Sequence, residues 1–426
     1  MAAAQFTSED VPVRALDRER NTIRALAARV AEIAALPVQL EKEELWRRLN
    51  RLDPVRPMVM LQMLDDSAWP DTGIEDALEC ADPFLRRQEL ELSRLLYQSE
   101  HQAGDMVVDT VIAVPYVVSD TGIGLETKWD HPDHWFGAYR FLPVIASEED
   151  ADKIRPPQVT VDHESTERLY EQHCDLYGDI LDVRKTTPHN CWFDPFDQFI
   201  QYRGVEQAFV DMLDRPAWLH GVLSRMTECD LARMEALEAQ GALSLNNGNR
   251  RIGPGGLGFT EDLPQPDFAG QVRIKDLWGT ASTQIFADVS PAMHEEFALQ
   301  YESRILSRFG LSCYGCCEPL HHKVDIAKKH LPNLRRISMS PWADVTVGAE
   351  AIGRDFVFSY KPNPAIMAGD TWDIETVRAD LRDVLEKTRG CVVEILMKDL
   401  HTCHGRPERM WEWTGAALEL AEEFAN

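Results

Sequence analysis

The chain has 426 residues, of which 44% are hydrophobic, and its formal net charge is −27. This length and apolar content suffice for one large α/β domain with an extension, or for two domains. So acidic a surface repels phosphate backbones, which excludes nucleic acid as the expected partner. Solubility is the commoner reason for such a charge, and a basic protein partner the rarer one.

Membrane and secretory classes are also excluded at this stage. The first residues lack a basic region followed by an apolar one, and no apolar run approaches the ~20 residues that span a membrane. The nine cysteines show no disulfide-framework spacing. We therefore expect a cytoplasmic protein without a membrane partner, in which clustered cysteines serve metal binding or catalysis.

Residues 1–55 are predicted to form a helical extension, because Leu26, Val30, Ile33 and Leu36 recur at helical spacing. We expect this extension to cover the mouth of the main domain or to form a homodimer. The main domain is predicted over residues 56–426, with a first strand at 56–63, a helix at 73–101 and an insertion around 102–150.

From about residue 165, short apolar runs alternate with helical stretches. Such alternation predicts a parallel sheet with right-handed crossovers. About eight strands result, which favours a (β/α)8 TIM barrel over a doubly wound open sheet. The runs lie at 179–183, 242–245, 272–274, 310–314, 334–339, 356–360 and 391–397, and the helices between them at 291–309, 319–330, 373–388 and 407–424.

Two adjacent thiols follow the run at 310–314. Cys316 and Cys317 directly precede Glu318 and Pro319, and proline is favourable at a first helical position. At the start of a helix the dipole would lower the pKa of the thiols. Neighbouring side chains diverge, so we expect one thiol to bind a metal while the other packs nearby. A pair of small buried apolar residues is the alternative.

A second thiol site follows the last predicted strand, where Cys403 lies between His401 and His404. Thiolates beside imidazole and carboxylate suit zinc, and a catalytic zinc ion has three protein ligands and one open position. Strands of a barrel carry their site residues at their C-terminal ends. The predicted ligands are Cys316, Cys317, Cys403 and Glu318, with His322, His401 or His404 as alternatives to Glu318.

Further residues are predicted to act on substrate. Lys361 lies in a loop stiffened by two prolines and could meet an anionic group, so it joins Glu318 and His401 as a predicted catalytic residue. The Gly253–Gly258 run fits no phosphate-binding spacing and is expected to be a flexible loop near the site. The predicted substrate-binding residues are Asn246, Asn247, Asp276, Tyr202 and Tyr314.

Over residues 150–424 the chain resembles the uroporphyrinogen decarboxylase-like superfamily of (β/α)8 barrels, with residues 56–60 similar to its first strand. The run from Arg203-Gly204 to Arg215-Pro216 resembles the helix after that family's substrate loop. Ser290-Pro-Ala-Met-His-Glu-Glu-Phe297 resembles its "S-P-x-x-x-x-E-F" helix entry. The decarboxylases carry an arginine-rich "R-Q-A-G-R" segment where this chain has Leu61-Gln-Met-Leu-Asp65-Asp66, so the arginines that would grip propionates are absent.

A second branch of the superfamily holds zinc methyltransferases that serve corrinoid proteins or thiols. They bind zinc through a His-x-Cys at one late strand end and a cysteine after the last strand. Cys316 (or Cys317) and Cys403 fall at those places, while Tyr314 or Gly315 stands where the family has histidine.

This resemblance implies a zinc-dependent methyltransferase that moves a methyl group between a small molecule or thiol and a corrinoid on a carrier protein. Zinc lowers the pKa of a bound thiol, as it does for water, and polarises a methylated heteroatom. The alternatives are a metal-free lyase of the decarboxylase kind and a tetrapyrrole-binding protein.

Overall fold

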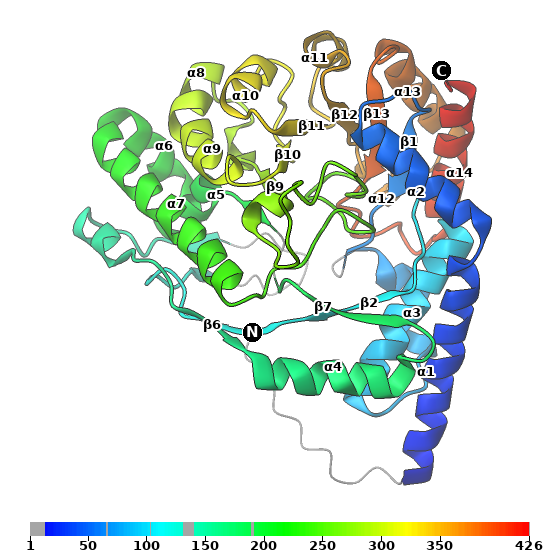
Figure 1. Cartoon of the computed structure of the whole chain (residues 1–426). Helices are drawn as coiled ribbons and strands as arrows, with labels where there is room; N and C mark the ends of the chain where they lie inside the picture. Colours follow the sequence, from blue (N-terminus) through cyan, green and yellow to red (C-terminus); the bar gives the residue numbers. More distant parts are fainter. Residues whose placement is uncertain (1–12, 65–66, 103, 131–139, 189–190, 426) are drawn as a thin grey trace.

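The computed structural model describes residues 13–64, 67–102, 104–130, 140–188 and 191–425. Asp65 and Asp66, in the segment compared with the decarboxylases, lie outside the described residues. Seven strands form one parallel sheet, with helices packed around it (Figure 1). Their order is β1 (Met58–Leu61), β13 (Val392–Met397), β12 (Val357–Tyr360), β11 (Leu334–Met339), β10 (Leu311–Tyr314), β9 (Trp278–Ala281) and β8 (Trp192–Phe193).

The sheet is strongly curved. Arg336 of β11 and Glu394 of β13 form a buried ion pair of 3.3 Å across the intervening β12. The Lys398 ammonium after β13 also lies 3.5 Å from the Cys316 sulfur after β10, although three strand spacings of a flat sheet would separate these two strands by about 14 Å. The parallel strand order confirms the predicted α/β architecture, and the curvature of the sheet is TIM-like. The structure does not confirm a closed eight-stranded barrel, since in the described part of the chain no strand ladder joins β8 to β1.

The first predicted strand contains β1 and the later strands match the sequence prediction, whereas the run at 179–183 overlaps β7, which lies outside the main sheet. β10, β11, β12 and β13 fall on predicted runs. By contrast, residues 242–245 form no strand and residues 274–276 form a 3₁₀ turn. β8 and β9 take their places in the sheet. β8 has only two residues, too few to produce a periodic pattern, and β9 contains Gly279 and Thr280 in place of a β-branched apolar run.

Three further strand pairs lie outside the main sheet. They are β2 (Val111–Pro115) with β7 (Asp182–Thr186), β3 (Val117–Asp120) with β6 (Val159–Asp162), and β4 (Lys128–Asp130) with β5 (Arg140–Leu142). The helices are α1 (Val13–Ala34), α2 (Pro37–Asn50), α3 (Pro83–His101), α4 (His163–Tyr177), α5 (Pro195–Arg203), α6 (Val205–Asp214), α7 (Pro216–Ala239), α8 (Pro291–His294), α9 (Gln300–Leu306), α10 (Val324–His330), α11 (Val345–Ile352), α12 (Ala365–Ala368), α13 (Ile374–Lys387) and α14 (Glu408–Glu423). None of the described helices is long and apolar enough to cross a membrane.

The N-terminal helices do not cover the mouth of the sheet. Trp46 and Leu49 of α2 pack with Val357 and Val392, which begin β12 and β13. The Asn50 amide donates to the carbonyl of Leu257 at 2.9 Å. Thus α2 closes the N-terminal end of the sheet, opposite the ends where strands run into the site loops. The earlier helix α1 packs on α3, away from the sheet (Figure 1).

The glycine-rich run 253–258 is packed into the interior of the curved sheet, which corrects the expectation of a flexible loop. A Cβ at Gly255 would lie 2.4 Å from the Arg336 guanidinium, and one at Gly256 would lie 2.4 Å from the Trp46 ring. Only glycine allows so close an approach of the backbone. A short hairpin, in which Arg251 pairs with Leu257, carries the run inward. These residues therefore fill the space that a packed barrel core would occupy.

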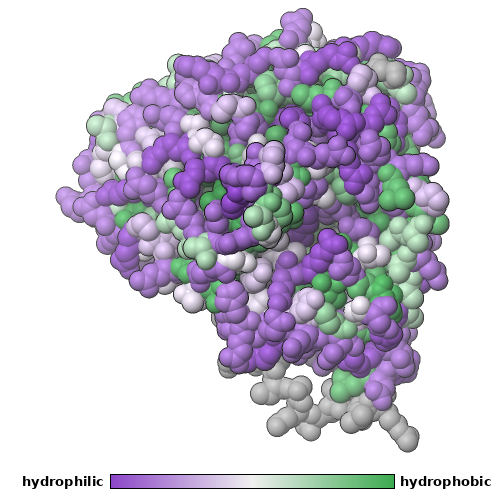
Figure 2. Space-filling model, viewed as in Figure 1, coloured by the Kyte–Doolittle hydropathy of each residue, from purple (hydrophilic) through white to green (hydrophobic). Residues whose placement is uncertain are grey.

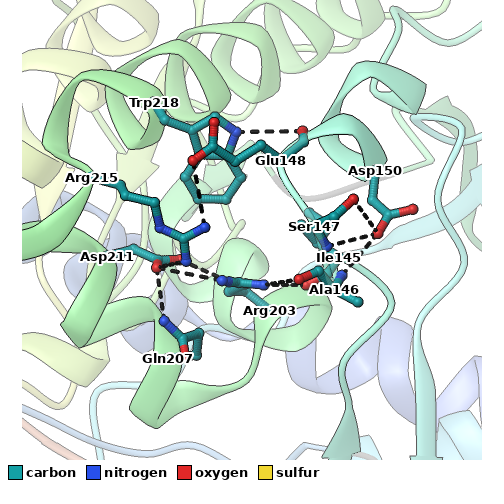
Figure 3. A network of polar contacts seen from close by, with 10 residues as sticks. All are labelled: Ile145, Ala146, Ser147, Glu148, Asp150, Arg203, Gln207, Asp211, Arg215 and Trp218. Carbon is teal, nitrogen blue, oxygen red and sulfur yellow. Dashed lines mark hydrogen bonds and ion pairs between the residues drawn. The ribbon is translucent and has the colours of Figure 1, made fainter.

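A second core forms around α5, α6 and α7. It includes the run from Arg203 to Pro216 that the sequence analysis compared with a known superfamily. There Arg203 donates to Asp211 at 2.7 Å and to the carbonyl of Ile145 at 2.6 Å, and Arg215 also pairs with Asp211 (Figure 3). The Arg215 guanidinium stacks over Trp218, 5.1 Å from the ring centroid. Every charge in this cluster is paired, which is typical of a structural network. The molecular face in Figure 2 is largely hydrophilic, in keeping with the high charge.

Candidate functional site

A thiol pair and a lysine meet at the C-terminal ends of β10 and β13. The Cys316 and Cys317 sulfurs lie 3.6 Å apart. The Lys398 ammonium donates to the two sulfurs at 3.5 Å and 3.4 Å. Because β11 and β12 separate the two strands in the sheet, the strand curvature brings these groups together. We call Cys316, Cys317 and Lys398 the thiol–lysine cluster.

The backbone explains why the two thiols converge, against the expectation that they diverge. Gly315 has φ +88° and turns the chain at the end of β10. Residues 316–318 follow as a bend instead of a strand or a helix. The next helix, α10, begins only at Val324. The predicted helix start at Pro319 is therefore wrong, and Lys398, in place of a helix dipole, supplies the positive charge beside the thiols.

The cluster favours one thiolate. The hydrogen bond from Cys316 lowers the pKa of Cys317 to about 6 against the opposing effect of burial, and the Lys398 charge lowers it further. The same hydrogen bond and burial raise the pKa of Cys316. Burial alone would lower the pKa of Lys398, but the neighbouring thiols and Asp399 outweigh it and raise that pKa. At neutral pH the cluster therefore consists of a thiol, a thiolate and an ammonium.

Glu318 holds the turn that carries the two thiols through hydrogen bonds to backbone N–H groups. Its carboxylate accepts from the Cys316 backbone N–H at 2.9 Å and from the Thr283 N–H at 3.2 Å. Burial raises the pKa of Glu318 to about 7. Both carboxylate oxygens thus bind backbone groups, and the residue acts by positioning Cys316.

Cys403 belongs to a different contact. Its buried thiol donates to the Asp71 carboxylate at 3.1 Å, and burial together with Asp71 raises the pKa of Cys403 to about 12. His401 and His404 are exposed, and His404 Nε2 lies 3.8 Å from Asp370. Among the described residues, no three His, Cys, Asp or Glu side chains are grouped to hold a metal ion. The predicted set of Cys316, Cys317, Cys403 and Glu318 is therefore not assembled as one site.

The thiol pair by itself fits two positions of a zinc ion. Two sulfurs bound tetrahedrally at about 2.3 Å from zinc lie about 3.8 Å apart, close to the 3.6 Å between Cys316 and Cys317. The space beside both sulfurs already holds a cation, the Lys398 ammonium. An Asp399 carboxylate oxygen lies 3.9 Å from the Cys317 sulfur and is a further hard donor at this place.

Three of the predicted substrate-binding residues have structural roles. Asn246 bonds to the backbone of Trp278 through both side-chain atoms, at 2.9 and 3.0 Å, and Asn247 donates to the Leu263 carbonyl at 2.7 Å. Asp276 is buried against Arg273. It lies just before β9, at the opposite end from the site, because the run at 272–274 is not a strand.

The remaining predicted residues lie in three different places. The Tyr314 hydroxyl is buried between His294 and Glu302, at 2.6 Å from each, outside the thiol–lysine cluster. Tyr202 packs in the second core. Lys361 lies near the cluster. Burial lowers its pKa to about 8, and the charges of Lys398 and Cys316 also act on that pKa. Its ammonium donates to the Ser359 carbonyl at 2.9 Å.

A groove adjoins the cluster, and the sequence reasoning missed the residues that line it. Its volume is about 440 Å³, and Gln62, Arg250 and Arg251 are among its polar lining residues. The Gln62 N–H donates to the Met397 carbonyl at 2.8 Å, which places the groove beside Lys398. A neighbouring cavity of about 40 Å³ shares Arg250 and Arg251. Two adjacent arginines after a predicted strand were the available sequence signal.

Comparisons with known proteins leave the family open. No family model matches the chain, and no curated protein matches it. Among solved structures, a methyltransferase from Methanosarcina mazei is similar over 89% of this chain and 98% of its own, with 12% identity and a TM-score of 0.45. A similarity of this degree does not establish either the fold or the reaction of this chain.

Proposed function

We propose that this chain is a methyltransferase whose reaction centre is the thiol–lysine cluster, with Cys316 and Cys317 as ligands of a zinc ion. The supporting observation is the geometry of the pair. Two sulfurs 3.6 Å apart, each near one buried ammonium, lie where two parallel strands end beside a groove of about 440 Å³. Strand ends of this kind carry the active sites of (β/α)8 enzymes.

The protein groups divide the work of holding the centre. Lys398 balances the negative charge of the thiols, and Glu318 fixes the Cys316 backbone through its 2.9 Å hydrogen bond. Ser340, which follows β11, has a buried hydroxyl with no hydrogen-bond partner among the described residues and is available to a bound molecule. Asp399 offers an oxygen beside Cys317.

Zinc bound there would supply Lewis acidity, polarising a methylated heteroatom or lowering the pKa of a thiol substrate. In this proposal the second substrate is a corrinoid on a carrier protein, and the groove receives the small molecule. Compared with the ligand set expected from the sequence, the proposal removes Cys403 and Glu318 and retains Cys316 and Cys317.

Metal content of anaerobically purified protein tests the zinc site. We expect about one zinc per chain, with most of it lost from Cys316→Ser and from Cys317→Ser. Cys403→Ser is the matched control, because Cys403 is also buried but lies on Asp71, and it should retain the metal. Zinc kept by both pair variants, or lost from the Cys403 variant alone, would contradict the assignment.

The reaction class needs its own assay. With free methylcobalamin as methyl donor and 2-mercaptoethanol as acceptor, the wild-type protein should accelerate demethylation, which the corrinoid spectrum reports. The Cys317→Ser variant should show no acceleration, while Cys403→Ser should resemble the wild type. If zinc is present and all three proteins leave the spectrum unchanged, methyl transfer between these partners is wrong even though the metal site is right.

A further inference from the structure

The groove beside the thiol–lysine cluster has a cationic wall, and apolar side chains line much of the rest. Arg250 and Arg251 form that wall, and Gln62, Gln98 and Asn249 add neutral polar groups. Its apolar lining comes from β1 and the residues after it, from α3, from the segment around residue 106 and from the glycine-rich run: Met60, Leu61, Met63, Leu64, Leu95, Met106, Val107 and Leu257. A bound molecule would therefore meet positive charge on one side and hydrocarbon over part of the others.

Neither arginine of this wall forms an ion pair within the part of the chain that the structure describes. The Arg250 side chain is exposed and Arg251 is half-buried. Among the described residues, the Arg251 guanidinium donates to the neutral Gln62 amide oxygen at 3.2 Å, and the Arg250 side chain has no hydrogen bond. By contrast, the buried Arg203 and Arg336 each contact a carboxylate, at 2.7 Å and 3.3 Å. Both groove guanidiniums are therefore accessible to a ligand that enters from solvent.

The backbone holds the arginine pair ready for binding. Arg251 pairs with Leu257 across the short hairpin, and the Gly258 N–H donates to the Arg250 carbonyl at 2.8 Å. The hairpin tip is the tightly packed glycine run, so the arginines stand on a rigid base. Adjacent guanidiniums on a fixed backbone favour the planar oxygens of an oxyanion, which guanidinium groups bind through paired N–H donors.

We propose that Arg250 and Arg251 form the subsite for the anionic end of the small-molecule substrate, an organic oxyanion with an apolar body. The identification of this molecule as the methyl donor or acceptor rests on the proposed function. The binding itself depends only on the groove. Arg251 lies close enough to Cys316 and Asp399 for their charges to act on it, so a ligand held by the arginines would extend toward the thiols.

The probe for this subsite is hexanoate, which has an apolar chain and one carboxylate, measured by titration calorimetry. Wild-type protein should bind hexanoate at least tenfold more tightly than 1-hexanol, which has the same chain without the charge. Arg250→Gln and Arg251→Gln should each weaken hexanoate binding about tenfold and leave 1-hexanol binding unchanged. Arg354→Gln, at an exposed arginine just before β12 and away from the groove, is the matched control and should bind hexanoate like the wild type.

Two results would overturn the subsite. One is equal hexanoate affinity in the wild type and both arginine variants. If Arg251→Gln does not fold, Arg251→Lys is the second substitution to measure. The other is inorganic phosphate binding as tightly as hexanoate, which would remove the apolar body from the proposal. A chelator that strips zinc should leave hexanoate affinity unchanged, so failure of the metal site and failure of this subsite are distinguishable.

Discussion

The two thiol sites of this chain contain the same functional group in opposite electrostatic surroundings. The Cys317 sulfur lies 3.4 Å from the Lys398 ammonium, and its pKa falls to about 6. The Cys403 sulfur lies 3.1 Å from the Asp71 carboxylate, and its pKa rises to about 12. At Cys317 the Lys398 ammonium adds to the effect of the Cys316 hydrogen bond, and at Cys403 the Asp71 carboxylate adds to the effect of burial, so the nearest charge acts in opposite directions at the two thiols.

The largest effect is expected from removing the cation. In metal-free protein, Lys398→Met should slow the alkylation of Cys317 by iodoacetamide at pH 7 by about tenfold, because a rise of the thiol pKa from about 6 to about 8 on loss of the ammonium would cut the thiolate fraction from about nine-tenths to about one-tenth. Peptide mass spectrometry gives the rate at each cysteine. Lys387→Met, at an exposed lysine on α13, is the control, and an unchanged rate in Lys398→Met would show that Lys398 does not stabilise the thiolate.

The second prediction acts on the inert thiol. Burial and the Asp71 charge both raise the pKa of Cys403, so Asp71→Asn removes one of the two causes and lowers that pKa toward its ordinary value. Below its pKa, a thiol gains about tenfold in thiolate for each unit that the pKa falls. Alkylation of Cys403 at pH 9 should accordingly rise about tenfold, while the rates at Cys316 and Cys317 stay the same. Slower alkylation of Cys403 would mean that Asp71 activates this thiol.

The smallest effect concerns the backbone of the two turns. Gly315 supplies the left-handed residue before the thiol pair, with φ +88°, whereas His404 adopts φ +61° after Cys403. A side chain in that region is strained, so His404→Gly should raise the free energy of unfolding by about 0.5 kcal/mol. Gly315→Ala should lower it, since the added Cβ would lie 2.2 Å from the Leu320 side chain. Denaturant midpoints measure both, and a destabilised His404→Gly variant would refute the strain argument.

The sequence predicted the late strands well because β10 to β13 are buried apolar runs followed by polar loops. It also located both thiol sites at strand ends. It did not predict how the groups pair, because Asp71 and Lys398 reach their cysteines through the fold and not through proximity in the chain. The two-residue strand β8 and the inward packing of Gly255 and Gly256 also depend on tertiary contacts that leave no periodic pattern.

The groove arginines were missed for a related reason. Arg250 and Arg251 stand in a segment whose preceding run was expected to be a strand and is not one. Their significance lies in the groove that they line, and a groove formed by segments far apart in the sequence cannot be recognised before the fold is known.

The most direct test of the central claim is site-resolved alkylation of all three thiols in metal-free protein, repeated after adding one equivalent of zinc. The account predicts rapid labelling of the Cys316–Cys317 pair at pH 7, protection of that pair by zinc, and slow labelling of Cys403 with or without zinc. Protection of Cys403 by the single zinc ion, or labelling of Cys403 as fast as the pair, would contradict it.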